Sequence, residues 1–250
     1  MTAEVMRNIF TRIPNFKDIK EKIFECNMLL LNEEKIKILR EYDFTHISLG
    51  IQTFNERILK KNNRSNPKHQ KIKEIVSNLQ AQDFFVNCDL MTFIDNGDET
   101  DINDTINDLI FMSKHIKPNR MTLYPKREAL TENPQRGIEK IILLRKMILK
   151  NMSKLNGYIL PQVEYSPKFF QPIVEEVDFL MNYAFYRSKD DFLKRNQYDS
   201  SAFINCPYNR QTVLGLGDYN CNCAYSYTDD IYVEERNLDW KDTMYLIIRR

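Results

Sequence analysis

The segment "HISLGIQTFNERILKKNNR" (residues 46–64) changes from an apolar strand pattern to a helical pattern at a single turn. Its first letters, "HISLGI", form a short apolar run, and a stretch with helical character follows. Gln52 stands at the turn and Arg64 stands about twelve residues later. A strand that leads through a polar turn into a helix is the building unit of α/β folds.

The same unit repeats along the first half of the chain. Amphipathic helical patterns separate short apolar runs at 21–26, 46–51, 84–94 and 120–124. Thr2 and Asn32 stand where N-caps are expected. Four units in strict alternation predict an α/β fold with a parallel sheet.

Composition excludes several classes of protein. The 250 residues hold 36 basic and 35 acidic side chains, so no net field favours nucleic acid or an anionic membrane surface. No apolar stretch approaches the roughly 20 residues of a spanning helix. The five scattered cysteines predict reduced thiols. We therefore expect a cytoplasmic protein with neither nucleic acid nor membrane as partner.

Two apolar stretches in the second half have alternative interpretations. The run at 138–152 has the pattern of a helix that either packs into a core or lies on a membrane surface, and the core is favoured. Aromatic residues at 169–187 either fill a core or line a flat ligand such as a tetrapyrrole, and the core is again favoured.

Polar residues stand at the ends of three of the predicted strands and within the third. They are Glu25, Gln52, Asp89 and Tyr124. Ligands of α/β folds bind at the carboxyl ends of the strands, where carboxylates and amides can meet hydroxyl and amine groups. Arg64 could hold a ligand carboxylate with two parallel hydrogen bonds. The alternative is that each residue solvates a strand end or caps a helix.

The motifs "FECN", "HISLGIQTFNERILKKNNR", "VNCDLM" and "RMTLYP", in this order and spacing, resemble the radical S-adenosylmethionine (SAM) enzymes related to oxygen-independent coproporphyrinogen III oxidase. The resemblance implies that Glu25, Gln52, Arg64 and Asp89 line the SAM site, with Arg64 near the methionine carboxylate. Tyr124 joins these cofactor-binding candidates by its position at a strand end.

The resemblance implies an incomplete TIM-like barrel of the radical SAM type. The helix at 2–13 resembles the helix that follows the second strand of the family, so the first two strands are expected to be missing. Residues 1–125 then correspond to strands three to six of the barrel, and residues 126–250 form a C-terminal α+β extension.

The sequence departs from the family at its redox centre. The family's C-x3-C-x2-C loop, which holds a 4Fe-4S cluster, occurs nowhere in the chain, nor does a "GGTPT"-type loop. A "GLPGQT"-type loop is replaced by "FIDNGDET", which keeps Gly97 and Thr100. Cys206, Cys221 and Cys223 form a C-x14-C-x-C pattern, yet free cysteines are more commonly inert.

No metal site and no catalytic residue is proposed from the remaining candidates. Cys26 and Cys88 are expected to pack in strands, and His46, His69 and His115 are expected to be structural.

Two functions remain open from the sequence. One is a truncated or split radical SAM enzyme, an oxidoreductase or methyltransferase, whose intact form cleaves SAM reductively and acts on a tetrapyrrole-like or other organic small molecule. The other is a non-catalytic degenerate barrel that binds SAM or a related nucleoside, or pairs with a second chain through its open sheet edge. Either function predicts a second chain or an oligomer that covers this edge.

Overall fold

The structure is a computed structural model. It describes residues 1–19, 22–94, 99–126, 134–160 and 183–191, and the strands at 213–214, 223–227 and 232–236. The chain divides into two compact units, Met1–Tyr198 and Asp199–Arg250.

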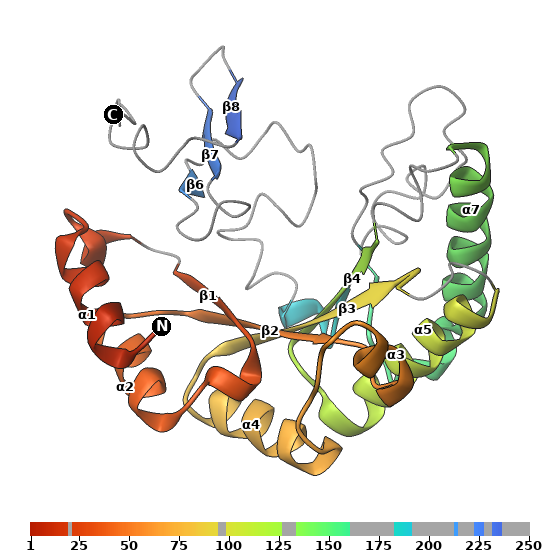
Figure 1. Cartoon of the computed structure of the whole chain (residues 1–250), viewed down its shortest axis with the longest axis horizontal. Helices are drawn as coiled ribbons and strands as arrows, with labels where there is room; N and C mark the ends of the chain where they lie inside the picture. The colour runs from red at the N-terminus through yellow and green to blue at the C-terminus, as the bar shows by residue number, and fades with distance from the viewer. Residues whose placement is uncertain are drawn as a thin grey trace. The chain divides into compact units, whose positions relative to one another are not determined.

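The first unit is built on one mostly parallel sheet (Figure 1). Its strands lie in the order β1 (Ile23–Cys26), β2 (His46–Gln52), β3 (Phe85–Thr92), β4 (Arg120–Pro125) and β5 (Tyr183–Tyr186). The first four strands pair in parallel, and β5 pairs with β4 in the antiparallel direction. The α/β fold predicted from the alternating pattern is confirmed, and the predicted strands agree with the observed ones to within a few residues.

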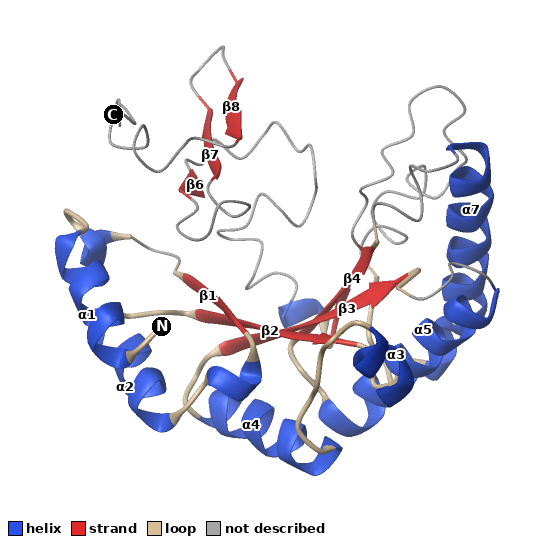
Figure 2. Ribbon diagram, in the orientation of Figure 1, coloured by secondary structure: helices blue, strands red, loops and turns tan. Residues whose placement is uncertain are grey.

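The helices lie on one face of this sheet (Figure 2). They are α1 (Ala3–Arg12), α2 (Glu33–Glu41), α3 (Glu56–Lys61), α4 (His69–Ala81), α5 (Glu99–Phe111) and α7 (Pro134–Asn151). A π-helical turn, Met112–Ile116, extends α5. Short 3-10 turns occur at Phe16–Asp18, Met28–Leu30 and Met152–Lys154.

Local sequence explains where several helices begin and end. The Thr2 hydroxyl accepts a hydrogen bond from the Val5 amide at 3.3 Å, and the Asn32 side chain accepts one from the Lys35 amide at 3.0 Å. Both predicted N-caps are therefore confirmed. Asp43 and Asp83 have φ of 57° and 63° just beyond α2 and α4, the left-handed conformation that commonly ends a helix.

The core lies between the helices and the apolar face of the sheet. Successive strand residues point to opposite faces, so Ile47, Leu49 and Ile51 share one face of β2, and all three are fully buried. They join residues such as Leu39 of α2 and Val76 of α4 in one hydrophobic cluster. Burial of each such side chain contributes about 1.5–3 kcal/mol relative to exposure.

The two apolar stretches of the second half are found partly in this core. Ile141, Leu144 and Ile148 of α7 are buried in the hydrophobic cluster. No helix in the described part of the chain is long and apolar enough to span a membrane. Of the aromatic stretch 169–187, the described residues Tyr183–Tyr186 form β5 and are buried.

The second unit contains β6 (Val213–Leu214), β7 (Cys223–Tyr227) and β8 (Tyr232–Arg236), which form a three-stranded antiparallel sheet. Several residues singled out in the sequence lie outside the described residues, namely Gly97, Cys206 and Cys221.

Candidate functional site

The sheet face opposite the helices carries polar side chains in register. Residues paired across parallel strands point to the same face, so two polar rows cross the sheet. The first row joins Glu25, Ser48, Asn87 and Arg120, and the second joins Gly50, Asp89 and Thr122. This polar face contrasts with the apolar face of the same strands, which packs against the helices.

A hydrogen-bond network connects three strands across the polar face. The Ser48 hydroxyl donates to Asp89 Oδ2 at 2.6 Å. The Asn87 amide donates to Asp89 Oδ1 and to Ser48 Oγ, both at 2.7 Å, and its oxygen accepts from the Thr122 hydroxyl at 2.8 Å. Asn87 is therefore the centre of the network, and Asp89 is fixed at both of its oxygens.

Burial raises the pKa of Asp89 from 3.8 to about 6. The hydrogen bonds from Ser48 and Asn87 and the positive charge of Arg120 lower the pKa of Asp89 and so oppose this rise. The nearby Glu25 carboxylate raises the pKa further. Burial also raises the pKa of Tyr124, and Asp89 is the next largest cause. Glu25, Asp89, Arg120 and Tyr124 are thus close enough to influence one another's charge.

Gln52 reaches the same face although the register shifts between Gly50 and Gln52. Its backbone is left-handed, with φ of 70°. A Cβ atom added to Gly50 would lie 2.9 Å from Gln52 Nε2, so the amide of Gln52 folds back over Gly50. The absence of a side chain at position 50 leaves the space that the Gln52 amide occupies.

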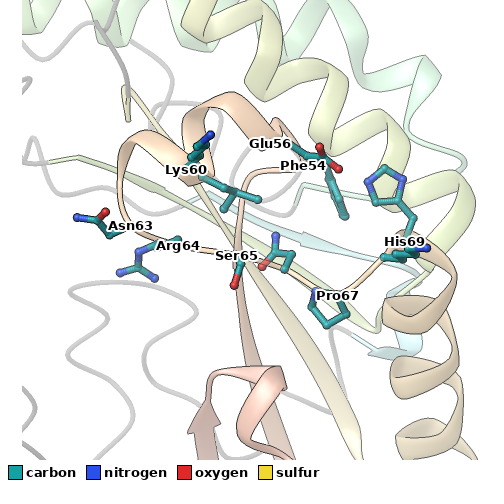
Figure 3. A pocket seen from close by; sticks show the side chains of 11 residues that line it. Phe54, Glu56, Lys60, Asn63, Arg64, Ser65, Pro67 and His69 are labelled. Carbon is teal, nitrogen blue, oxygen red and sulfur yellow. The ribbon is translucent and has the colours of Figure 1, made fainter.

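Arg64 lies on the loop between α3 and α4, and its side chain is exposed. This loop borders a cleft of about 780 Å³. Lys60, Asn63 and Arg64 lie on one side of the cleft, and Phe54 and His69 lie on the other (Figure 3). The structure thus brings Glu25, Gln52, Asp89 and Tyr124 to one face of the sheet and places Arg64 on the loop beyond β2.

Sequence reasoning missed the residues that support Asp89. These residues are Ser48, Asn87, Arg120 and Thr122, and each stands earlier in its strand than the predicted site residue of that strand. A signal for them exists in the sequence. Alternate residues of "ISLG", "VNCDLM" and "RMTLY" are polar or small, and this period of two marks a second face.

Cys26 and Cys88 lie in strands of the sheet. Burial raises the pKa of the Cys26 thiol to about 12 and that of the Cys88 thiol well above its ordinary value, as is usual for packed, unreactive cysteines. Among the described residues no group of three or more His, Cys, Asp or Glu side chains could hold a metal ion.

The histidines have structural surroundings. His46 is buried, contacts Thr45 through Nδ1 at 2.7 Å and packs on Phe85. His69 packs between the rings of Phe54 and Phe111. His115 also packs on Phe111.

Asp89 has the acceptor capacity that a ligand with amine or hydroxyl groups needs. Each of its oxygens accepts one protein hydrogen bond, and a carboxylate oxygen has two lone pairs. One lone pair on each oxygen is therefore left for a donor from outside the network. The polar face fits the ribose hydroxyls and the ammonium group of SAM in this respect.

Comparison with known proteins agrees with this chemistry. Residues 3–109 match the model of the Radical SAM superfamily. The fold is similar to that of coproporphyrinogen III oxidase (HemN) from Escherichia coli, whose structure is described as that of a radical SAM enzyme. That match has a TM-score of 0.57 and 15% sequence identity, and it covers 94% of this chain but half of the length of HemN. No curated protein matches the chain. Residues 3–109 thus match the Radical SAM superfamily, and the fold of the chain is similar to that of HemN.

Proposed function

We propose that this chain forms the SAM-binding face of a radical SAM enzyme of the coproporphyrinogen oxidase-like group. The network that fixes Asp89 through Ser48 and Asn87 carries the proposal. A half-buried carboxylate held at both oxygens, on the face of the sheet that the helices leave uncovered, is suited to binding rather than to packing. The substrate class that we propose is a tetrapyrrole-like or another organic small molecule.

The polar side chains take different parts in binding. Asp89 and Glu25 accept hydrogen bonds from the ribose hydroxyls and the methionine ammonium, and their negative charges attract the sulfonium cation. The Gln52 amide both donates and accepts. Arg64 extends from the loop to the methionine carboxylate. Tyr124 contributes a hydroxyl donor, and burial raises its pKa further above neutral pH.

Reductive cleavage of SAM, the chemistry of the superfamily, requires electrons from an iron–sulfur cluster. The sequence contains no C-x3-C-x2-C spacing. We therefore place the cluster ligands outside residues 1–250, either in a longer form of this chain or in a second chain. The 250 residues would then bind SAM without cleaving it.

A second function is favoured by the edge of the sheet. Among the described strands β1 pairs with β2, and no described strand pairs with its other edge, which could therefore accept a strand of another chain. Ile23 on β1 is 44% exposed, and the following Leu29 and Leu30 are 51% and 61% exposed. A non-catalytic barrel could bind another chain here while it keeps the nucleoside contacts.

Titration calorimetry with SAM tests the proposed binding. The Asp89→Asn variant removes the negative charge but keeps the shape. Asp83→Asn is the matched control, because Asp83 is exposed and lies in the turn before β3. We expect the wild type and Asp83→Asn to bind alike and Asp89→Asn to bind about tenfold more weakly, a loss of about 1.4 kcal/mol. Equal binding by both variants, or no saturable binding by the wild type, would refute the proposal.

Anaerobic reconstitution with iron and sulfide tests the placement of the cluster ligands. We expect no stoichiometric 4Fe-4S absorbance from the 250 residues. A stoichiometric cluster would show that Cys206, Cys221 and Cys223 are ligands after all. The binding experiment and the reconstitution therefore separate a SAM site without a cluster from a complete radical SAM centre.

A further inference from the structure

The backbone at Gln52 needs support from its surroundings. Its φ of 70° places a residue with a side chain in the left-handed region, which is unfavourable for residues other than glycine. Such a conformation persists where neighbouring contacts determine it, and it is common at functional sites. The contacts around residues 51–54 therefore show what holds the Gln52 amide over Gly50.

The first contact comes from Asn66. Its Nδ2 donates to the carbonyl oxygens of Ile51 and Thr53, both at 2.9 Å, so one side-chain amide joins the carbonyl groups of the two residues that flank Gln52. The Thr53 amide also donates to the Ile51 carbonyl at 2.9 Å, which closes a tight turn around Gln52. Asn66 follows Arg64 by two residues, so the same side chain ties the Arg64 loop to the end of β2.

The second contact comes from α5, on the helical side of the sheet. Asp108 Oδ2 accepts hydrogen bonds from the Thr53 hydroxyl at 2.6 Å and from the Phe54 amide at 3.2 Å. Thr53 is 2% exposed and Asp108 is 8% exposed, so these bonds are shielded from water. Asp108 fixes the two residues that follow Gln52 and lies away from the polar face.

We propose that Asn66 and Asp108 are positioning residues of the nucleoside site, which hold Gln52 in its left-handed conformation so that its amide lies over Gly50. This inference rests on the proposed function. Neither Asn66 nor Asp108 belongs to the two polar rows that cross the sheet. Because their contacts are to the residues on either side of Gln52, we expect both to act on a ligand through Gln52. The amide of Gln52 is thereby oriented before a ligand arrives, which reduces the entropy lost on binding.

An Asn66→Asp variant removes the two donated hydrogen bonds while it keeps the shape of the side chain. The matched control is Asn62→Asp, because Asn62 Nδ2 also donates to a backbone carbonyl at 2.9 Å, that of Ile58, but does not contact residues 51–53. We expect Asn66→Asp to weaken SAM binding about tenfold and Asn62→Asp to leave it within about twofold.

A double-mutant cycle with Gln52→Ala separates positioning from general damage. If Asn66 acts through Gln52, Asn66→Asp causes no further loss of affinity once Gln52 is an alanine. Two losses that add independently would overturn the proposal. Asp108 supplies a second test if Asn66→Asp fails to fold, because Asp108→Asn keeps an acceptor oxygen and should keep the affinity, whereas Asp108→Ala should lose it.

A measurement without ligand distinguishes failure of this inference from failure of the proposed function. In protein with ¹⁵N-labelled glutamine, the side-chain amide protons of Gln52 should show a nuclear Overhauser effect to the Gly50 α protons, because Gln52 Nε2 lies over Gly50. We expect this signal in the wild type and in Asn62→Asp but not in Asn66→Asp. Its survival in Asn66→Asp would overturn the positioning role, whether or not SAM binds.

Discussion

The buried carboxyl group of Asp108 makes a testable prediction about stability. Burial raises its pKa from 3.8 to about 7, the hydrogen bonds from Thr53 and Phe54 oppose the rise, and Asp104 and Asp101 add to it. The folded chain therefore holds this proton more tightly than the unfolded chain does. The stability that Asp108 contributes is present below about pH 4 and is lost as the pH rises to about 7.

The Asp108→Asn variant has no proton to lose at this position. A pKa difference of one unit between the folded and unfolded chain changes the free energy of unfolding by about 1.4 kcal/mol. The rise in the pKa of Asp108 therefore corresponds to a loss of roughly 4 kcal/mol of stability between pH 4 and pH 7. The asparagine keeps one oxygen as an acceptor for the Thr53 hydroxyl and the Phe54 amide. We expect the variant to match the wild type at pH 4 and to be more stable by about 1–4 kcal/mol at pH 8.

Urea unfolding followed by circular dichroism at pH 4.5, 6 and 8 measures this difference. Asp83→Asn is again the control, because it makes the same substitution at an exposed aspartate. The reasoning is refuted if Asp108→Asn is less stable than the wild type at pH 8, or if its stability changes with pH as steeply as that of the wild type.

Three further predictions concern the polar face, the loop and the core. In Gly50→Ala the new methyl group displaces the end of the flexible Gln52 side chain, so urea unfolding should show a loss of less than about 1 kcal/mol while SAM affinity measured by calorimetry falls about fivefold. Arg64→Lys keeps the positive charge but cannot make two parallel hydrogen bonds, so it should bind SAM more weakly in calorimetry while its stability in urea stays unchanged. Equal affinity would exclude a paired contact between Arg64 and the methionine carboxylate of SAM. Phe93→Ala removes a fully buried ring and should cost about 3–5 kcal/mol in urea unfolding, and a loss below about 1 kcal/mol would show that the ring is not in the core.

The sequence predicts the sheet and its helices well because their signals are local. Apolar periodicity defines β1 to β4, and a cap residue such as Asn32 makes its hydrogen bond three residues away. The antiparallel pairing of β5 with β4 has no such signal, because it joins residues about 60 positions apart in the sequence, such as Leu123 and Tyr183. Only the folded chain shows it.

The candidate site is predictable in part for the same reason. Glu25, Gln52, Asp89 and Tyr124 stand at or near strand ends, and the parallel register brings them to one face. The partner of a buried carboxyl group is harder to predict, since Asp108 bonds Thr53 across 55 positions. Contacts of this kind depend on how α5 packs on β3, which periodicity does not specify.

A structure of the chain with bound S-adenosylhomocysteine tests the central claim most directly. The nucleoside should lie across the polar face, with its ribose or amine groups within hydrogen-bond distance of Asp89 and the Gln52 amide beside it. A ligand bound elsewhere, for example wholly within the cleft beside Phe54 and His69 and away from Asp89, would contradict the account.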